Sequence, residues 1–224
     1  MADIDLKAEA QDTSLPDTAV LFGADSQLVP ITRPSAYPIS LFARMVDLPA
    51  LPLSTVCDPT GVTSCSTVIN DLIASMIAGD LPNRPLLING RFRTTAPIVI
   101  DRSALTVDPI LGARTQISLL GHGPAHGQIG SDHAGACVDY RGNSGNGIRS
   151  LLSWSGFGLY GPDKDSGSIG IKTDNLAYFS LHDLDLNNFE RGFDGTDTFI
   201  GEFSGSQFSS NTYGMRLRSV DVAG

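Results

Sequence analysis

A glycine followed by a large apolar residue recurs at nearly equal intervals in the second half of this chain of 224 residues. The pairs begin at Gly147, Gly170, Gly192 and Gly214, at spacings of 23, 22 and 22 residues. Self-similarity at a period in the twenties is typical of proteins whose coils stack along one axis. Residues 148–221 therefore constrain the fold more than any other part of the sequence.

Runs of alternating apolar and polar residues precede the last three of these pairs. Alternation with period two indicates short strands that bury one face. When the chain is aligned on the last two glycines, Leu181 falls over Phe203. The same alignment places Leu186 over Phe208, so apolar residues stack on apolar residues. The apolar positions of the three runs are Leu152, Trp154, Phe157 and Leu159, then Phe179, Leu181, Leu184 and Leu186, then Phe199, Phe203 and Phe208.

Strands of this length, with small polar residues and glycine at the corners and no helical run between them, predict an all-β parallel β-helix. Each coil would contribute two or three short strands to parallel sheets. An antiparallel sandwich is the alternative, because it also alternates and has turns every roughly 8–12 residues. The equal spacing of the glycine pairs favours stacked coils, since a sandwich does not need it.

The composition fits a turn-rich β protein and argues against several classes of partner. Only 17% of the residues are charged and 24 are glycine, which does not fit a coiled coil or a disordered chain. The net charge of −9 disfavours nucleic acid and anionic membranes as partners. No apolar run approaches the ~18 residues of a membrane span, and the acidic amino terminus does not resemble a signal peptide. We therefore expect synthesis in a cytoplasm without export through a cleavable signal.

Residues 1–47 differ from the rest and are too few to hold a core of their own. Their sequence predicts two short strands at 19–22 and 27–31 around a turn, and a short helix capped by Ser40. We expect this module to pack on a partner or on copies of itself. Residues 48–55 are rich in proline and predict a stiff linker.

Residues 56–224 begin with a turn and a predicted helix at 66–78. Ser64 or Ser66 is its expected N-cap, and Gly79 is expected to end it in a left-handed conformation. We expect the apolar face of this helix to cover the open end of the first coil, where unpaired backbone groups would otherwise meet water. The face consists of Val68, Ile69, Leu72, Ile73, Met76 and Ile77.

Coils are predicted over about residues 85–222. Residues 85–93 and 96–101 predict the first strands, with a turn at Gly90, and residues 116–124 predict a further strand that ends in a glycine turn.

The three cysteines, Cys57, Cys65 and Cys137, are too few for a disulfide framework. Nothing near them supplies the four ligands of a zinc site, and the sequence predicts neither a metal site nor a cofactor. We expect three thiols, with Cys137 buried in a strand as a small hydrophobe. Cys57 and Cys65 are close enough in sequence to pair if the protein meets an oxidising medium.

The order of these elements resembles the amino-terminal part of the pectate-lyase-like right-handed β-helix found in bacteriophage tailspikes. The resemblance covers about residues 56–222, and residues 15–43 are similar to short attachment modules at the start of phage tail fibres and spikes. Each piece is short, and their order makes the resemblance specific. The pieces are Gly61-Val62-Thr63, the helix at 68–78, Leu87-Ile88-Asn89-Gly90-Arg91-Phe92, and Ile117-Ser118-Leu119-Leu120-Gly121-His122-Gly123.

The resemblance implies a homotrimeric protein of the phage tail, located in the virion. Residues 1–47 would attach to other tail or baseplate proteins, and the coils would begin a shaft or carry a receptor-binding part. Unlike the family, the sequence stops at Gly224 after a few coils and without a carboxy-terminal cap. We therefore expect either a fragment of a longer spike or a coil end that another protein covers.

Asp183 and Asp185 are the candidate catalytic residues. They flank the apolar Leu184, so both are expected on the outer face of one strand, ~7 Å apart, a separation that suits inverting glycoside hydrolysis. Tailspike depolymerases and the polygalacturonases related to them use carboxylates on such a face. The structural alternative is a pair of solvated aspartates, because outward positions of any soluble β-helix are polar. Gly121-His122-Gly123 resembles a tripeptide that carries a catalytic-site histidine in polygalacturonases, although no acidic pair precedes it here.

Trp154 and Tyr160 are candidate carbohydrate-binding residues, since aromatic rings can form a shelf for a sugar. Their alternation with polar residues favours a place partly in the core.

These observations favour a structural function, the attachment and shaft-start portion of a phage tailspike or tail fibre. One alternative is a polysaccharide depolymerase, a glycosidase or lyase acting on host capsule or O-antigen, with Asp183 and Asp185 as acid and base. A second alternative is a carbohydrate-binding module without turnover, in which Trp154 contacts the glycan.

Overall fold

The computed structural model describes residues 20–22, 36–38, 49–82, 84–104, 117–142, 151–176, 178–198 and 201–218. The chain divides into two compact units, Met1–Leu48 and Pro49–Gly224. In the first unit, β1 (Val20–Phe22) pairs antiparallel with β2 (Ala36–Pro38), and β1 lies within the strand predicted at 19–22. The strand predicted at 27–31 and the helix predicted at Ser40 lie outside the described residues.

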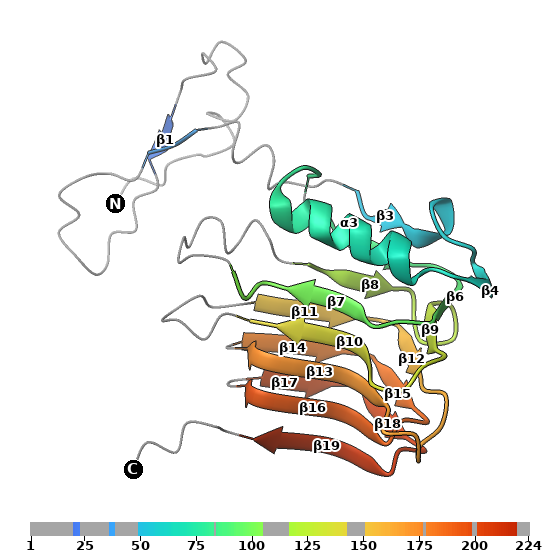
Figure 1. Ribbon diagram of the computed structural model, residues 1–224. Coiled ribbons are helices and arrows are strands. Elements are labelled where there is room, and N and C mark those ends of the chain that lie inside the picture. The colour runs from blue at the N-terminus through green and yellow to red at the C-terminus, as the bar shows by residue number, and fades with distance from the viewer. Residues whose placement is uncertain are drawn as a thin grey trace, which may run out of the picture. The chain divides into compact units, whose positions relative to one another are not determined.

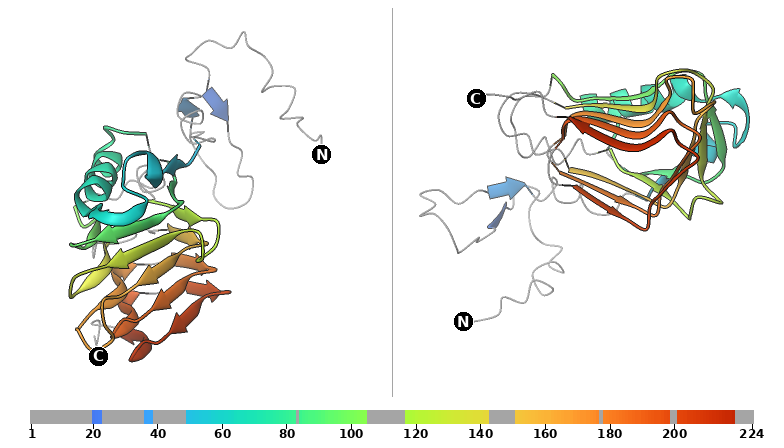
Figure 2. Two further views of the ribbon diagram at one scale, coloured as in Figure 1. Left: turned by 90° about the vertical axis from the view of Figure 1, so that its right-hand side faces the viewer. Right: turned by 90° about the horizontal axis from the view of Figure 1, so that it is seen from below.

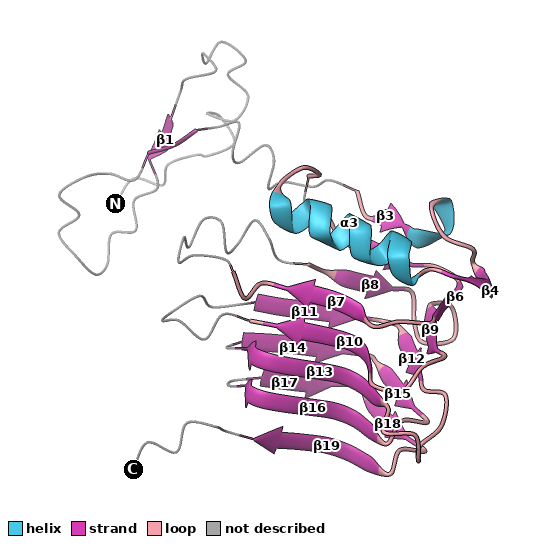
Figure 3. Ribbon diagram, in the orientation of Figure 1, coloured by secondary structure: helices cyan, strands magenta, loops and turns pink. Residues whose placement is uncertain are grey.

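The described strands of the second unit form three parallel sheets (Figure 1, Figure 3). Sheet 1 contains β3 (Leu51–Pro52), β5 (Leu86–Ile88), β8 (Leu119–Gly121), β11 (Leu151–Ser155), β14 (Tyr178–His182) and β17 (Gly201–Ser204). Sheet 2 contains β4 (Thr60–Ser64), β6 (Arg91–Thr94), β9 (Gln128–Ser131), β12 (Gly158–Tyr160), β15 (Asp185–Asn187) and β18 (Gln207–Ser209). Sheet 3 contains β7 (Ile98–Asp101), β10 (Ala136–Arg141), β13 (Ile169–Leu176), β16 (Arg191–Thr198) and β19 (Tyr213–Arg218).

The chain passes through the three sheets in a fixed order, so three consecutive strands form one coil with a strand in each sheet. β5, β6 and β7 make the first such coil, and β17, β18 and β19 make the last one described. Among the described strands of this unit, neighbouring coils pair only in parallel. This pairing excludes the antiparallel sandwich. Seen from below, the coils lie over one another (Figure 2).

Apolar side chains stack in three ladders, one in each sheet. Residues of one ladder occupy the same register position in successive strands, and those of every coil before the last are buried in the core. The predicted stacking of Leu181 on Phe203 and of Leu186 on Phe208 is confirmed. The ladders are Leu86, Leu119, Trp154, Leu181 and Phe203 in sheet 1, Phe92, Ile129, Leu159, Leu186 and Phe208 in sheet 2, and Ile98, Val138, Ile171, Phe193 and Met215 in sheet 3.

The glycine–apolar repeat corresponds to the sheet 3 ladder over its last three coils. Phe193 pairs with Ile171 on one side and with Met215 on the other, each 22 residues away. The pair at Gly147 lies outside the described residues, and Val138 takes the register position beside Ile171. The repeat is therefore regular only from β13 onward, because the preceding coil is longer.

The helix α3 (Ser66–Ala78) lies across one end of the stack, next to β7 (Figure 1). It matches the predicted span and ends at Gly79, whose φ of 85° is left-handed as predicted. Ile69, Ile73 and Met76 are buried against the first coil, and Val68 is exposed. No helix in the described ranges is long and apolar enough to cross a membrane.

The N-cap of α3 is Cys65, not Ser64 or Ser66, and it makes no side-chain capping hydrogen bond. Ser64 Oγ accepts the N–H of Ser66 at 3.4 Å. Ser66 Oγ instead reaches the turn between β6 and β7, where it accepts the N–H groups of Thr95 at 2.9 Å and Ala96 at 3.1 Å. The serine predicted as a cap therefore ties the helix to the first coil.

Asn70 satisfies the backbone at the edge of sheet 3. Its Nδ2 donates to the Pro97 carbonyl oxygen at 2.9 Å, and its Oδ1 accepts the Val99 N–H at 2.8 Å. β7 is the terminal strand of this sheet, so these backbone groups have no neighbouring coil to pair with. The prediction that the helix covers the first coil and its unpaired backbone groups is confirmed.

The segment predicted as a linker, residues 48–55, is instead part of the folded stack from Pro49 onward. Leu51 and Pro52 form β3, which pairs in parallel with β5. The 3-10 helix η1 (Leu53–Thr55) follows, and Leu53 is 1% exposed. Proline content predicted a stiff linker, but Leu51 pairs with β5 and Leu53 is buried in the core.

The outer face of sheet 3 carries a ladder of opposite charges. Asp139, Lys172, Asp194 and Arg216 occupy one register position in successive coils. Asp194 is buried and pairs with Arg216 at 2.6 Å and with two further arginines. Burial alone would raise the pKa of Asp194, but the hydrogen bond from Arg216 and the charges of the three arginines lower this pKa overall. The ladder therefore holds neighbouring coils together by charge as well as by packing.

We expect Asn70→Ala to lower the free energy of unfolding by about 1–3 kcal/mol, because it leaves the Pro97 carbonyl and the Val99 amide without partners. Urea unfolding followed by circular dichroism measures this change. Thr67→Ala, on the exposed side of the same helix, is the matched control and is expected to shift stability by less than about 0.5 kcal/mol. Equal stability of the Asn70 variant and the wild type would contradict the edge-covering role.

Candidate functional site

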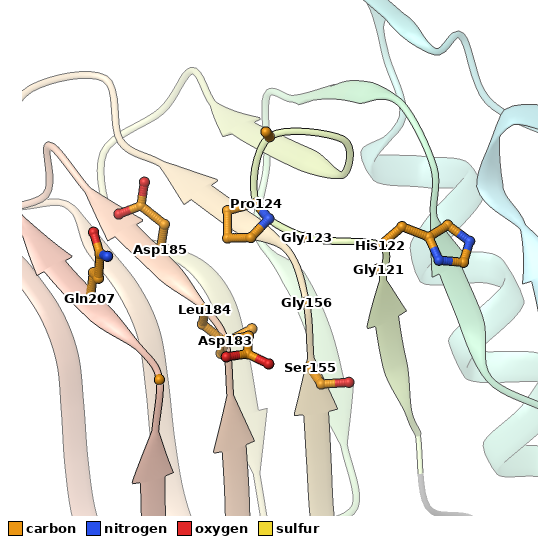
Figure 4. A pocket seen from close by; sticks show the side chains of 12 residues that line it. Gly121, His122, Gly123, Pro124, Ser155, Gly156, Asp183, Leu184, Asp185 and Gln207 are labelled. Atoms are coloured by element: carbon orange, nitrogen blue, oxygen red, sulfur yellow. The ribbon is translucent and has the colours of Figure 1, made fainter.

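A groove of about 690 Å³ lies on the surface where sheet 1 meets sheet 2 (Figure 4). Its walls come from the corners that follow four successive strands of sheet 1, namely β8, β11, β14 and β17. The groove therefore exists only because the corners of separate coils stack. Its polar lining residues are His122, Ser155, Asp183, Asp185 and Gln207.

The corners of this groove use a left-handed backbone conformation. Gly156, Asp183 and Gly205 follow the paired strand residues of β11, β14 and β17, and their φ angles are 74°, 50° and 62°. The N–H of Gly156 donates to the His182 carbonyl at 3.0 Å, and the N–H of Asp183 donates to the Ser204 carbonyl at 2.9 Å. Glycine adopts this conformation without strain, whereas a residue with a Cβ does not. Asp183 therefore stands where its neighbouring coils have glycine.

The Asp183 side chain is exposed and lies over Gly205. A Cβ at position 205 would come 2.2 Å from Asp183 Oδ1, so the glycine makes room for the carboxylate. The Asp183 carboxylate accepts no hydrogen bond from a residue that the structure describes. Asp183 thus combines a left-handed backbone with a carboxylate that has no partner among the described residues. Such an outlier in a groove motivates a functional hypothesis.

Asp185 is held in place by two hydroxyl groups. Tyr160 Oη donates to Asp185 Oδ2 at 3.2 Å, and Ser209 Oγ donates to Asp185 Oδ1 at 2.8 Å. Burial, then the charge of Asp185 and this hydrogen bond, raise the pKa of Tyr160, with Arg91 opposing. The Tyr160 hydroxyl therefore keeps its proton and remains a donor to Asp185.

The structure brings the two predicted aspartates to one groove, but not to one strand. Asp183 lies in the corner after β14, whereas Asp185 is the first residue of β15. Leu184 between them is 1% exposed, as predicted. Figure 4 shows the two carboxylates on either side of Leu184, pointing in different directions. The prediction of a shared strand face is wrong because the left-handed residue turns the chain between sheet 1 and sheet 2.

The groove also contains polar residues that lie far in the sequence from the two aspartates. Gly121-His122-Gly123 forms one wall, and the His122 side chain points away from the aspartates in Figure 4. Gln207 is the register partner of Asp185, 22 residues later. The 22-residue repeat that aligns the apolar residues also aligns Gln207 with Asp185, so this signal could have identified Gln207 as a groove residue. His182 lies outside the groove lining, with its ring nitrogens against Ser180 Oγ and Ser204 Oγ.

The two candidate carbohydrate-binding residues, Trp154 and Tyr160, differ in their exposure to solvent. Trp154 is fully buried, and its Nε1 donates to the Ile117 carbonyl at 3.0 Å, so no sugar can reach its face. The assignment of Trp154 to sugar contact is therefore corrected to a core role, which its alternation favoured. Tyr160 is partly exposed, and its ring lies across Gly158, where a Cβ would come 2.6 Å from it. Tyr160 remains a candidate contact.

A second, smaller groove of about 350 Å³ lies on the outer face of sheet 2. Arg91, Arg93 and Tyr160 line it. Tyr160 thus belongs to this groove while its hydroxyl reaches Asp185 in the first one. Among the described residues, no group of three or more histidine, cysteine, aspartate or glutamate side chains is placed to hold a metal ion.

Comparison with known proteins gives one distant structural relation. Neither a protein family model nor a curated protein matches the chain. Among solved structures, the chain is similar to ORF18 of Geobacillus virus E2, with a TM-score of 0.51 and 16% sequence identity. The similarity covers 74% of this chain and 31% of that chain, so this chain spans less than a third of the length of the viral protein. At this identity the similarity indicates a shared fold alone.

The left-handed position of Asp183 predicts an unusual order of variant stabilities. We expect Asp183→Gly to unfold at the same temperature as the wild type or higher, because glycine relieves the backbone strain. Asp183→Ala keeps a Cβ and loses the polar side chain, so its free energy of unfolding is expected to fall by about 1 kcal/mol. Differential scanning calorimetry of the three proteins tests this order. A glycine variant less stable than the alanine variant would contradict it.

Proposed function

We propose that this chain is a structural protein of a bacteriophage virion, the attachment and shaft-start portion of a tailspike or tail fibre. The observation that carries the proposal is the fold similarity to a phage protein over 74% of the chain. The stack of coils supports it physically. Neighbouring coils are joined by continuous hydrogen-bonded ladders, which make a stiff rod suited to transmitting position from a tail to a host surface.

The finer fold assignment is part of this proposal. We infer that the three sheets are the faces of a single right-handed parallel β-helix of the pectate-lyase-like kind. The fixed order in which the chain visits the sheets supports a helical path, and parallel crossovers are right-handed in nearly all proteins.

Residues 1–47 would dock to other tail or baseplate proteins, and the chain would act as a homotrimer. The described part of the first unit supports association, because β1 and β2 have three residues each. A two-stranded sheet of this size is at best marginally stable alone in water. Packing against partner subunits or tail proteins would supply the missing core.

We expect light scattering on the purified chain to give a molar mass three times its 23.7 kDa. Dilution over a wide concentration range should preserve this mass if the trimer is the working form. A chain that begins at Pro49 and lacks the first unit is the matched control and should associate less tightly. A monomer at all concentrations would remove the tail-shaft interpretation.

A second function, depolymerisation of host capsule or O-antigen polysaccharide, is favoured by the groove that holds Asp183 and Asp185. In glycoside hydrolysis one carboxylic acid protonates the leaving oxygen, and the other carboxylate activates water or attacks the sugar. Asp185 is oriented by Tyr160 and Ser209, and Asp183 is open to solvent, so both can face a chain lying in the groove. Under this hypothesis Asp183 is the acid and Asp185 the base.

Incubation with a panel of capsular and O-antigen polysaccharides tests the second function. If the groove is catalytic, we expect Asp183→Asn to lower sugar release by about 100-fold or more, while its amide keeps the left-handed corner. Asp165→Asn, in an exposed loop, should release sugar at the wild-type rate. Binding without release would indicate the carbohydrate-binding alternative, and neither binding nor release would leave the structural function alone.

A further inference from the structure

Two of the three thiols lie in the core near the amino end of α3. Cys57 is 8% exposed and Cys65 is 2% exposed, and both belong to the core that the helix covers. Cys65 Sγ lies 3.9 Å from the carbonyl oxygen of Asp58, the residue after Cys57. The two cysteine side chains therefore lie near each other in one buried cluster, although they are not neighbours in the sequence.

The backbone of each cysteine is anchored to a different element. The Cys57 N–H donates to the Leu53 carbonyl at 2.8 Å, which closes the turn after η1. The Cys65 N–H donates to the Arg93 carbonyl on β6 at 2.8 Å, and the Cys65 carbonyl accepts the first helical bond, from Ile69, at 3.0 Å. A covalent link between the two side chains would join η1 to the amino end of α3.

The segment between the cysteines contains β4 and begins with a turn that Asp58 holds in place. The Asp58 carboxylate accepts the N–H groups of Thr60 and Thr63, both at 2.9 Å, and the Thr60 hydroxyl at 2.6 Å. The hydrogen bonds from Thr60, and then those from Thr63, hold the pKa of Asp58 well below its usual range. These hydrogen bonds fix the turn that separates the two cysteines.

Burial distinguishes these thiols from reactive surface cysteines. Burial, followed by the hydrogen bond and charge of Cys65, raises the pKa of Cys57 to about 12. Burial also raises the pKa of Cys137, in β10, to about 12, and its contact is with the Thr94 side chain rather than with a thiol. The Cys57 and Cys137 thiols are thus protonated and slow to react in the folded chain. Oxidation of the Cys57–Cys65 pair would therefore need local opening of the segment from η1 to α3.

We propose that Cys57 and Cys65 form an oxidisable pair, which closes a disulfide when the protein leaves a reducing compartment and staples α3 over the first coil. The oxidant is a small-molecule disulfide such as oxidised glutathione. One cysteine thiolate attacks a glutathione sulfur and releases one glutathione thiolate. The second cysteine thiolate then attacks the protein sulfur of this mixed disulfide and releases the second glutathione. Two electrons pass from the cysteine pair to glutathione disulfide, and the two thiol protons end on the released glutathione.

This inference does not depend on the proposed function, since it rests on the burial of both cysteines in one cluster and on the anchored turn between them. Closing the loop removes conformations from the unfolded chain, so the bond stabilises the end of the stack at which α3 lies.

The test uses the full chain, incubated with oxidised glutathione at mildly alkaline pH, then unfolded in the presence of N-ethylmaleimide and analysed by mass spectrometry. We expect one modified cysteine per chain, Cys137, and a cross-linked peptide that contains Cys57 and Cys65. Cys137→Ala should form the same cross-link. Cys57→Ser and Cys65→Ser should not form it. Three modified cysteines in the wild type, also after incubation in a urea concentration that opens the segment from η1 to α3, would overturn the proposal, as would a cross-link through Cys137.

Thermal unfolding supplies a second readout. We expect the oxidised wild type to unfold about 5 °C above the reduced protein, with dithiothreitol reversing the difference. Cys57→Ser should show no dependence on the oxidant. A cross-linked wild type with an unchanged or lower Tm would overturn the stabilising role of the bond.

Discussion

The structure depends on the in-register stacking of one coil on the next. No coil forms a sufficient core by itself, because each has a single short strand per sheet and its apolar side chains also pack against those of the neighbouring coils. The ladders also meet across the interior. Phe193 of sheet 3 and Phe203 of sheet 1 pack edge to face with ring centroids 5.1 Å apart, and Phe179 contacts both. Trp154 fits this column because its single polar atom finds the Ile117 carbonyl.

The first coil and the last described coil of the stack differ in how far their open side is covered. At one end, Asn70 and Ser66 use side-chain groups to replace the backbone partners that a preceding coil would provide. In the last described coil, Tyr213, Met215 and Leu217 of β19 are 58%, 41% and 55% exposed, because nothing in the described residues lies over them. α3 therefore does more than bury apolar side chains, because its polar side chains also satisfy backbone groups at the edge of the first coil. The Cys57–Cys65 pair lies at this same end.

The candidate site is a product of the corners rather than of the strands. The turns that follow β8, β11, β14 and β17 each contain one residue with a positive φ, and stacking places these turns side by side. Glycine is the low-strain choice, so the aspartate at position 183 stands out, and Gly205 leaves room for it. Asp185, only two positions later, belongs to a regular strand and has ordered partners. Two aspartates that are near in sequence thus have different backbones, exposures and hydrogen bonds.

The sequence alone determined the features that depend on local periodicity. These include the short parallel strands, the stacking of Leu181 on Phe203, and the helix at 66–78 with its end at Gly79. Tertiary structure decided the features that depend on contacts between coils. It placed Asp183 in a corner, made the proline-rich segment around Leu53 part of the core, and gave Ser66 a partner in the first coil rather than a capping role. Alternation reports which side chains share a face, but the partner of a corner or of a helix end comes from a segment distant in the chain, which no local pattern encodes.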